Sequence, residues 1–356
     1  MVMNAGMAGG MTGPILIWGA GAIGGTLGAA FIRAGHAVTF VDSDVSHVKA
    51  INAEGLRIVG PILQDTVKAP AFLATALAGR FERIFLCVKA HHTRAAATAL
   101  LPHLADHGCV VSAQNGLNEI TIAEIVGKER TVGCFVNFGA DYLEPGVVHY
   151  SGHGAVVIGE LDGKRTARIE ELHRLMQDFE PKAVLTDNIW GFLWGKMIYG
   201  ALLFATALTD DAIADVFADR RYRPVLAAVG LEVGAVAKAN GVRAEAFDGF
   251  DPSAFAPGSP TAATDRSFDE MVVHNRRSAK SHTGIWRDLA IRKRKTEVDA
   301  QIFPIVEIGR KLGIATPLTA RTVEMIHEIE DGKRQLVLSN LDELAEAMPS
   351  TPASAR

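Results

Sequence analysis

Cysteine is scarce in this chain, with three residues in 356. Cys87, Cys109 and Cys134 lie inside apolar runs, and their spacing matches neither a disulfide framework nor a zinc motif. We therefore expect buried thiols in a reducing compartment and predict no metal site.

A strong excess of charge is also missing. The net charge is −4 and the isoelectric point is near 6.3, which gives no reason to expect a nucleic acid or membrane surface as a partner. The first twelve residues lack the basic start of a secretory signal. We expect flexible tails at residues 1–13 and 346–356, and a soluble, cytoplasmic protein.

One long hydrophobic run is present, from Ile189 to Leu208, and its length approaches that of a membrane span. Lys196 near its middle would be costly in a bilayer, and the run lacks basic flanks. A helix buried among other helices is the preferred interpretation, and a membrane span is the alternative.

The first half of the chain alternates short β-rich runs with helical patterns, which is typical of a parallel α/β sheet. Val147–Tyr150 and Ala155–Gly159 are expected to pair as a hairpin. A helix is predicted over Arg94–Leu104. Strands are predicted at Ile15–Trp18, Ala37–Val41, Ile84–Val88, Val110–Ser112, Thr131–Val136, Val147–Tyr150, Ala155–Gly159 and Ala183–Thr186.

The second half is predicted to contain helices only, which gives a Rossmann-type domain at 14–187 and a helical substrate and dimerisation domain at 188–345. The stretch 244–264 is rich in Ala, Pro, Gly and Ser and is expected to be a loop over the site or an exposed excursion. The predicted helices are Ile189–Leu208, Val225–Ala239, Ile285–Lys293, Thr296–Leu312 with a break at Pro304, Thr319–Asp331 and Gln335–Ala345.

A glycine turn, Gly19-Ala20-Gly21-Ala22-Ile23-Gly24, joins the first strand to an amphipathic helix. In this context Gly19 permits the tight turn, Gly21 lets the backbone approach a pyrophosphate, and Gly24 allows close helix–strand packing. The N–H groups of the helix N-terminus, at Ala22 and Ile23, face the phosphates. A dinucleotide site is predicted, and a turn that binds no ligand is the alternative.

Asp42 ends the second strand, 18 residues after Gly24. A carboxylate there can accept hydrogen bonds from the adenosine ribose and would repel a 2′-phosphate, so NAD is favoured and NADP is possible. In the alternative, Asp42 caps the following helix, although Ser43 or Asp44 could do this instead.

Lys196 is the predicted proton donor for a carbonyl reduction. Its neighbours Trp194, Gly195, Met197 and Ile198 would partly desolvate it, which disfavours the ammonium and lowers its pKa. It can also pair with a substrate carboxylate. A structural, ion-paired lysine is the alternative.

Glu297 follows a basic run, Arg292–Lys295, at the start of a predicted helix. It could reach the lysine or the nicotinamide ribose, or it could simply complement the helix dipole. The basic run could steer an anionic substrate, and a solvated basic face is the other interpretation.

Five stretches occur in an order that is more specific than the glycine turn alone. They are Gly-Ala-Gly-Ala-Ile-Gly-Gly at 19–25, Cys-Val-Lys-Ala at 87–90, Gln-Asn-Gly-Leu at 114–117, Leu-Trp-Gly-Lys-Met at 193–197 and Lys-Thr-Glu-Val-Asp at 295–299. With them the sequence resembles the ketopantoate reductase (2-dehydropantoate 2-reductase) family from Ile15 to about Gln335.

The resemblance implies a Rossmann domain followed by a helical domain, and a homodimer. It implies that Lys196 is the catalytic lysine and that Glu297 organises cofactor and substrate. It also implies that Lys89 and Asn115 contact the cofactor, with Asn115 near the nicotinamide, and that the backbone of Gly139 contacts the carboxamide end.

The chain departs from the family pattern where the substrate would bind. Gly200 and Phe204 occupy positions where members usually carry asparagines, and Lys280–Trp286 replaces a polar Asn/Ser cluster. Asp42-Ser43 stands where NADP-dependent members place an arginine. The predicted pocket is larger and more apolar, lined by Phe204 and Trp286, with Lys280, Ser281 or His282 at its polar end.

The sequence therefore predicts an NAD(P)-dependent oxidoreductase that prefers NAD, interconverts a 2-keto acid, or a related carbonyl compound, and its hydroxy form, and is not specific for ketopantoate. One alternative is a true 2-dehydropantoate 2-reductase of pantothenate synthesis. The other is a dinucleotide-binding redox sensor without catalytic activity, which would need neither Lys196 nor Glu297.

Overall fold

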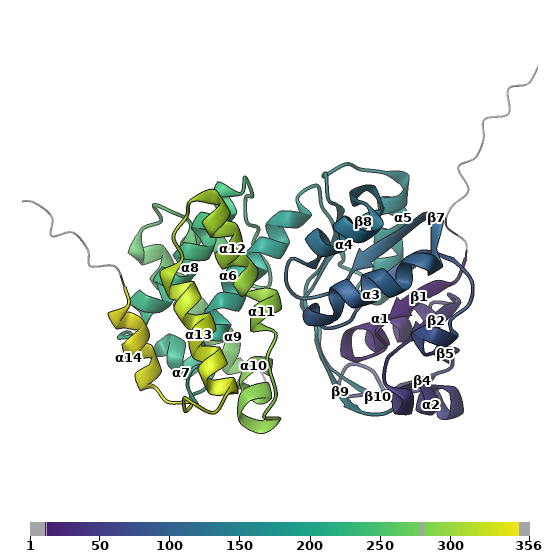
Figure 1. Ribbon diagram of the computed structural model, residues 1–356, viewed down its shortest axis with the longest axis horizontal. Helices are drawn as coiled ribbons and strands as arrows, with labels where there is room; N and C mark the ends of the chain where they lie inside the picture. The colour runs from purple at the N-terminus through teal and green to yellow at the C-terminus, as the bar shows by residue number, and fades with distance from the viewer. Residues whose placement is uncertain (1–10, 12, 278–280, 349–356) are drawn as a thin grey trace, which may run out of the picture. The chain divides into compact units, whose positions relative to one another are not determined.

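The computed structural model describes residues 11, 13–277 and 281–348 (Figure 1). Most of the two predicted tails, and Lys280, lie outside the described residues. The chain divides into two compact units, Met1–Ile189 and Trp190–Arg356. This boundary lies two residues after Asp187, the last residue of the first domain predicted from the sequence.

The first unit is built on an eight-stranded sheet with the order β12-β11-β8-β7-β6-β1-β2-β5. The strands β5, β2, β1, β6, β7 and β8 run parallel, whereas β11 is antiparallel to β8. Their bounds are β1 Ile15–Trp18, β2 Val38–Val41, β5 Ala71–Phe72, β6 Phe81–Leu86, β7 Leu104–Ser112, β8 Thr131–Val136, β11 Val156–Glu160 and β12 Val184–Leu185.

Helices cover both faces of this sheet because its central strands are apolar on both sides. In β1, Ile15 and Ile17 belong to the core under α1 and α5, whereas Leu16 and Trp18 belong to the core under α3 and α4. Period-two alternation along the strand produces this division. The helices are α1 Ala22–Arg33, α2 Val45–Glu54, α3 Thr93–Leu100, α4 Asn118–Val126 and α5 Ala167–Phe179.

A second, four-stranded sheet in this unit was not expected from the sequence. Its order is β4-β3-β10-β9, and Figure 1 shows β4, β9 and β10 close to α2. The predicted hairpin of Val147–Tyr150 with Ala155–Gly159 is wrong, because β10 pairs with β9 and β3 while β11 pairs with β8 and β12. The strands are β3 Leu56–Val59, β4 Asp65–Val67, β9 Gly139–Glu144 and β10 Val147–Gly152.

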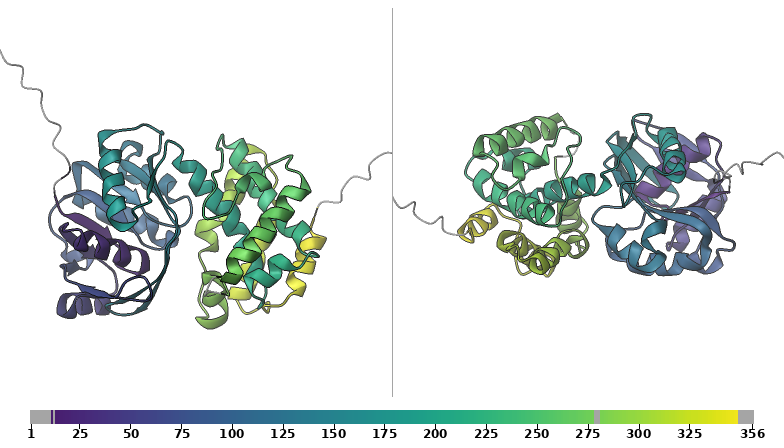
Figure 2. Two further views of the ribbon diagram at one scale, coloured as in Figure 1. Left: turned by 180° about the vertical axis from the view of Figure 1, so that it is seen from behind. Right: turned by 90° about the horizontal axis from the view of Figure 1, so that it is seen from above.

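The second unit is helical over its described residues, as predicted, and Figure 2 shows it from two further sides. Its core includes α8, on which buried apolar residues such as Val225, Val229, Val233 and Val236 recur every three or four positions. The helices are α6 Ile189–Thr206, α7 Ile213–Ala218, α8 Arg223–Ala239, α9 Thr261–Arg277, α10 Gly284–Trp286, α11 Val298–Gln301, α12 Phe303–Leu312, α13 Pro317–Glu330 and α14 Ser339–Glu346.

The stretch 244–264 is not an exposed excursion. Phe247, Phe250 and Phe255 are buried, and a short 3-10 helix spans Pro252–Phe255. A Cβ added at Gly234 of α8 would lie 2.1 Å from the Phe255 carbonyl oxygen, so this segment packs directly on the helix. In the described part of the second unit, α7 and α9 are the helices that were not predicted from the sequence.

The predicted break near Pro304 is present, because α11 ends at Gln301 and α12 begins at Phe303. The predicted helix 285–293 is α10 followed by one turn of π-helix, Arg287–Ile291. Lys293 then adopts a left-handed conformation with φ +50°, which is unusual for a residue with a side chain.

Among the described residues, one helix is long and apolar enough to cross a membrane, and it is α6. Two thirds of its apolar window, 67%, is buried inside the protein, which fits a core helix. All three cysteines carry free thiols, and burial raises the pKa of Cys109 to about 12.

Candidate active site

The residues predicted to hold the cofactor follow the carboxyl ends of parallel strands. The glycine turn follows β1, Asp42 follows β2 and Lys89 lies three residues after β6. Carboxyl ends of parallel strands share one edge, and β1 lies between β2 and β6. Ligands of doubly wound sheets bind at such an edge.

Two glycines of the turn are required by packing. Gly19 has φ +98°, and an added Cβ would lie 2.9 Å from the Val88 backbone nitrogen. At Gly24 an added Cβ would lie only 1.9 Å from the Gly19 carbonyl oxygen and 2.7 Å from the Ile17 side chain. Gly19 therefore lets the turn lie against the segment after β6, and Gly24 lets helix α1 pack closely on β1.

Gly21 is different, because packing does not require it. Its φ is −68°, which any residue can adopt, and an added Cβ would meet nothing within 4 Å among the described residues. It occupies the N-cap of α1, where no described side chain caps the helix. The space above Gly21 and the first N–H groups of α1 fit a pyrophosphate, which needs close backbone approach.

Asp42 is half-buried and accepts two backbone hydrogen bonds. Its Oδ2 accepts from Ala20 N–H at 2.8 Å and its Oδ1 from Asp44 N–H at 3.0 Å. Asp44, not Asp42, caps α2, accepting from the N–H groups of Ser46 and His47. A carboxylate offers about four acceptor sites, so Asp42 retains capacity for ribose hydroxyls.

The segments after β6 and β7 are tied together. The Gln114 amide donates to the Val88 carbonyl and to Thr93 Oγ1, both at 2.8 Å. Asn118 donates to the Asn115 carbonyl at 2.7 Å, which fixes the Asn115 backbone while its side chain stays exposed. Asn115 is thus held at the same sheet edge as Lys89, which is half-buried.

Gly139 begins β9, three residues after the end of β8. An added Cβ there would lie 2.6 Å from Ser151 Oγ on β10. The structure therefore brings the glycine turn, Asp42, Lys89, Asn115 and Gly139 to one edge of the first unit. The donors and acceptors present there fit a dinucleotide.

In the second unit, Lys196 and Gly200 are one turn apart on α6, so they share a face of that helix. Both are half-buried. An added Cβ at Gly200 would meet nothing within 4 Å among the described residues, so this face has room beside the lysine. Phe204 is only 1% exposed and packs inside the unit.

Glu297 is half-buried at the N-cap of α11. The preceding residue anchors it, because both the N–H and the hydroxyl of Thr296 donate to Glu330 Oε1 at 2.7 Å. Two cations of the adjacent basic run, Arg292 and Arg294, form ion pairs with Asp288 at 2.9 and 2.8 Å. These ion pairs neutralise part of the positive charge that the basic run could present to an anionic substrate.

Ser281, His282 and Trp286 form one cluster. The Trp286 indole N–H donates to Asp210 Oδ1 at 2.9 Å, and the ring stacks on His282 with centroids 4.1 Å apart. Ser281 Oγ lies 2.8 Å from His282 Nδ1, and His282 Nε2 donates to the Asp210 carbonyl at 3.1 Å. We call Asp210, Ser281, His282 and Trp286 the Trp286 cluster.

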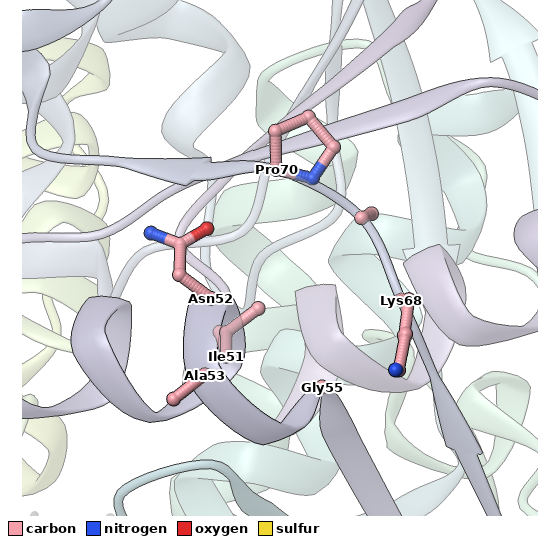
Figure 3. Close-up of a pocket in the computed structure, with 7 residues that line it drawn as sticks. Ile51, Asn52, Ala53, Gly55, Lys68 and Pro70 are labelled. Atoms are coloured by element: carbon pink, nitrogen blue, oxygen red, sulfur yellow. The ribbon is translucent and has the colours of Figure 1, made fainter.

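A hollow of about 690 Å³ in the second unit includes two members of this cluster, Asp210 and Trp286. Its other walls include Leu289, Lys293 and Leu336, so it combines apolar and cationic surface. A smaller hollow of about 360 Å³ in the first unit lies between α2 and the segment before β5 (Figure 3). There the Asn52 side chain donates to the Ala71 carbonyl and accepts from the Ala71 N–H, which indicates a structural role.

The chain matches the model of a known family in both units. Residues 15–163 match the family described as ketopantoate reductase PanE/ApbA, and residues 188–330 match its C-terminal domain. The chain belongs to the ketopantoate reductase family. The expected fold, and the expectation of an NAD(P)-dependent oxidoreductase acting on a CH–OH group, are confirmed at the level of that family.

Relatives of this ketopantoate reductase family member match over nearly their full length. The 2-dehydropantoate 2-reductase of Mesorhizobium japonicum is 26% identical over 340 residues, covering 88% of this chain and 97% of the relative. The crystal structure of a PanE/ApbA family ketopantoate reductase from Ralstonia eutropha is 26% identical with a TM-score of 0.77, covering 90% and 99%. A structure of D-mandelate dehydrogenase with NADH and anilino(oxo)acetate is 23% identical with a TM-score of 0.77, covering 90% and 99%, and shows the same fold.

Sequence reasoning missed two polar residues beside the predicted sites of this family member. Asp210 belongs to the Trp286 cluster, but it occurs in a short polar run, Thr209-Asp210-Asp211, that resembles any helix-ending loop. His47 is 1% exposed and bonds to the glycine turn. In the sequence His47 is a single histidine in the first turn of a helix, three residues after its N-cap Asp44, and this position alone does not predict a bond to the glycine turn.

Proposed function

We propose that this chain is an NAD-preferring dehydrogenase of the ketopantoate reductase family that acts on a 2-hydroxy acid, or its keto form, larger and more apolar than pantoate. The observation that carries the substrate part is the open face beside Lys196. Gly200 leaves room for a substrate side chain and removes a polar partner. A substrate that lacks hydroxyl groups does not need that partner.

Lys196 is the proposed acid–base group. It donates a proton to the carbonyl oxygen in reduction and accepts the hydroxyl proton in oxidation. Glu297, held by the bonds of Thr296 to Glu330, orients this lysine and a cofactor ribose. The cofactor would supply the hydride in reduction and accept it in oxidation. In reduction the substrate carboxylate pairs with the Lys196 ammonium before proton transfer, whereas in oxidation the neutral amine of Lys196 accepts the proton.

The cofactor proposal rests on Asp42 together with Gly21. The carboxylate at the end of β2 is held by the Ala20 and Asp44 N–H groups, so it cannot easily turn away from a 2′-phosphate. Such a phosphate would meet like charge. Lys89, Asn115 and Gly139 would contact the rest of the cofactor along the same edge.

The cofactor test compares kcat/KM with NAD and with NADP. We expect NAD to be preferred, and Asp42→Asn to reduce that preference by about 10- to 100-fold, as expected for a charged partner. Asn retains the size and one acceptor oxygen of Asp, which makes it a matched control for shape. A preference of the unmodified enzyme for NADP would sink the proposal.

The substrate test is a panel of 2-hydroxy acids with graded side chains, with NADH absorbance as the signal. We expect apolar and aromatic members to give higher kcat/KM than pantoate. Gly200→Asn, which the open space accommodates, should move the ratio toward pantoate by about 10- to 100-fold. An unchanged ratio would show that Gly200 does not face the substrate.

A true 2-dehydropantoate 2-reductase is the second candidate, favoured by the names of relatives such as those from Mesorhizobium japonicum and Halobacterium salinarum. It predicts that ketopantoate exceeds every other substrate in kcat/KM. A redox sensor without activity predicts cofactor binding with no turnover on the whole panel. The proposal also includes a cytoplasmic homodimer formed through the helical unit, which sedimentation of the purified protein would test.

A further inference from the structure

His47 contacts the centre of the glycine turn from outside it. Its imidazole is buried on α2, and Nε2 lies 2.9 Å from the Ala20 carbonyl oxygen. The other ring nitrogen, Nδ1, lies 2.8 Å from the backbone N–H of Gly146, in the turn between β9 and β10. A carbonyl only accepts and an N–H only donates, so the ring is the neutral tautomer with its proton on Nε2.

The Ala20 residue is therefore held from two sides. Its N–H donates to Asp42 Oδ2 at 2.8 Å and its carbonyl accepts from His47. Helix α1 also lies close to this carbonyl, since a Cβ added at Gly25 would lie only 2.8 Å from its oxygen. Of the two side chains, Asp42 directly follows β2, and His47 lies on α2, the next element along the chain.

The orientation of the Ala20 carbonyl determines where the next N–H points. In a trans peptide the C=O of one residue and the N–H of the following residue point in opposite directions. All described peptide bonds are trans. With the Ala20 carbonyl turned toward His47, the Gly21 N–H is directed away from α2, on the residue whose Cβ position is open.

We propose that His47 is a positioning residue for the dinucleotide, holding the Ala20–Gly21 peptide in the orientation that presents the Gly21 N–H to the pyrophosphate. This inference rests on the proposed cofactor site and adds a residue to it. A flipped peptide would present the Ala20 carbonyl oxygen to the phosphates instead, and an oxygen repels them.

The ring is itself fixed by the second sheet. Tyr142 of β9 packs edge-on against it, with centroids 5.1 Å apart, and the Tyr142 hydroxyl donates to Asp44 Oδ2 at 3.2 Å. Gly146, with φ +80°, supplies the N–H that holds Nδ1. The hairpin β9–β10 thus sets the rotamer and the tautomer of His47, and through it the glycine turn.

Two substitutions separate this role from simple packing. The amide nitrogen of His47→Gln can take the place of Nε2 and keep the bond to Ala20. The amide oxygen of His47→Asn takes the place of Nδ1 and keeps only the bond to Gly146. Each variant loses one of the two ring bonds, so their thermal stabilities should fall by similar amounts.

The experiment measures dissociation constants of the full chain and both variants for NADH, for ADP-ribose and for adenosine, which lacks the pyrophosphate. We expect His47→Asn to weaken NADH and ADP-ribose binding about tenfold, the effect of one oriented hydrogen bond. His47→Gln should stay within about twofold of the unmodified chain, and adenosine binding should change little in either variant.

Equal losses in the two variants that follow their melting temperatures would overturn the inference, because they would show a structural role only. A loss of adenosine binding as large as that of ADP-ribose would overturn it as well. If the unmodified chain bound neither NADH nor NADPH, both this inference and the proposed function would be wrong. The unmodified chain therefore distinguishes the two failures.

Discussion

The glycine turn and the Trp286 cluster are held together in different ways. At the turn, the side chains of Asp42 and His47 bond to backbone groups of Ala20, Asp44 and Gly146. In the Trp286 cluster, Trp286 bonds to the side chain of Asp210 and Ser281 to that of His282, and one bond, from His282 to the Asp210 carbonyl, goes to the backbone.

A backbone partner is present whichever residue occupies a position, whereas a side-chain partner disappears when its residue changes. The geometry of the glycine turn therefore depends on the side chains of Asp42 and His47, but not on the side chain of Ala20, which they bond through its backbone. The Trp286 cluster depends on the identity of each member, as does the open position at Gly200.

The largest effect expected from this comparison is a substitution in the helical unit that lowers kcat and leaves NADH affinity unchanged. Lys196→Ala should lower kcat by about 10²- to 10⁴-fold, the usual contribution of an acid–base group. The dissociation constant for NADH should stay nearly unchanged, because the glycine turn belongs to the other unit. Steady-state kinetics and NADH fluorescence titration measure the two quantities. Loss of NADH binding would contradict the assignment of Lys196 to chemistry.

Within the glycine turn, alanine substitutions at Gly24 and Gly21 should have different effects. Gly24→Ala should destabilise the protein by about 3 kcal/mol or more, because its Cβ would lie 1.9 Å from a backbone oxygen. Gly21→Ala should leave the stability within about 1 kcal/mol and weaken NADH binding, since its Cβ enters the open space. Urea denaturation and NADH titration measure both effects. Similar stability losses would show that Gly21 is also a packing position.

The turn was predictable because each glycine occupies a fixed place between a strand and a helix, and that local pattern needs no distant partner. The order of the five matching stretches likewise indicated the fold, and the role that it implies for Lys196 stays a prediction. The second sheet was not predictable, because β9 is only partly buried and lacks a clear alternation, and β10 pairs with β3, which lies far away in sequence. His47 depends on that sheet and was missed with it.

In the helical unit, amino-acid composition gave a wrong expectation of exposure for one stretch, because its burial depends on distant helices. The stretch 244–264 resembles a loop, yet its phenylalanines pack into the core once α8 is present. Helix α9 was missed because few apolar residues mark its face, with Phe268, Met271 and Val272 the clearest. Asp210 was missed because only the folded chain brings it to Trp286.

A pH effect is expected at Glu119, in the first turn of α4. Both carboxyl oxygens are buried, and burial raises the pKa of this carboxyl to about 8 against the weaker opposing effect of the neighbouring Ser112 hydroxyl. The folded state thus binds a proton that the unfolded state releases near pH 4.5. The resulting stability is fully present below pH 4.5 and is lost progressively as the pH rises from 4.5 through 8.

The measurement is the free energy of unfolding in urea between pH 5 and pH 8. We expect a decline of about 1.4 kcal/mol per pH unit at most from this group, and Glu119→Gln should remove it, since an amide does not titrate. The helical unit provides the contrast, because Glu343 has a pKa lowered to about 2 by Arg334 and Arg321 and contributes no change in this range. A slope that persists in Glu119→Gln would assign the titration to other groups.

The smallest effect is expected in the Trp286 cluster. Trp286→Phe keeps a ring that can stack on His282 and loses only the indole N–H that donates to Asp210. Because Asp210 is exposed and water can replace the lost donor, the cost should be about 1 kcal/mol, or roughly fivefold in the substrate KM. NADH affinity should not change. Asp210→Asn, whose amide oxygen still accepts from the indole, should behave like the unmodified enzyme; if it matched Trp286→Phe instead, the charge of Asp210 rather than this hydrogen bond would be what the substrate senses.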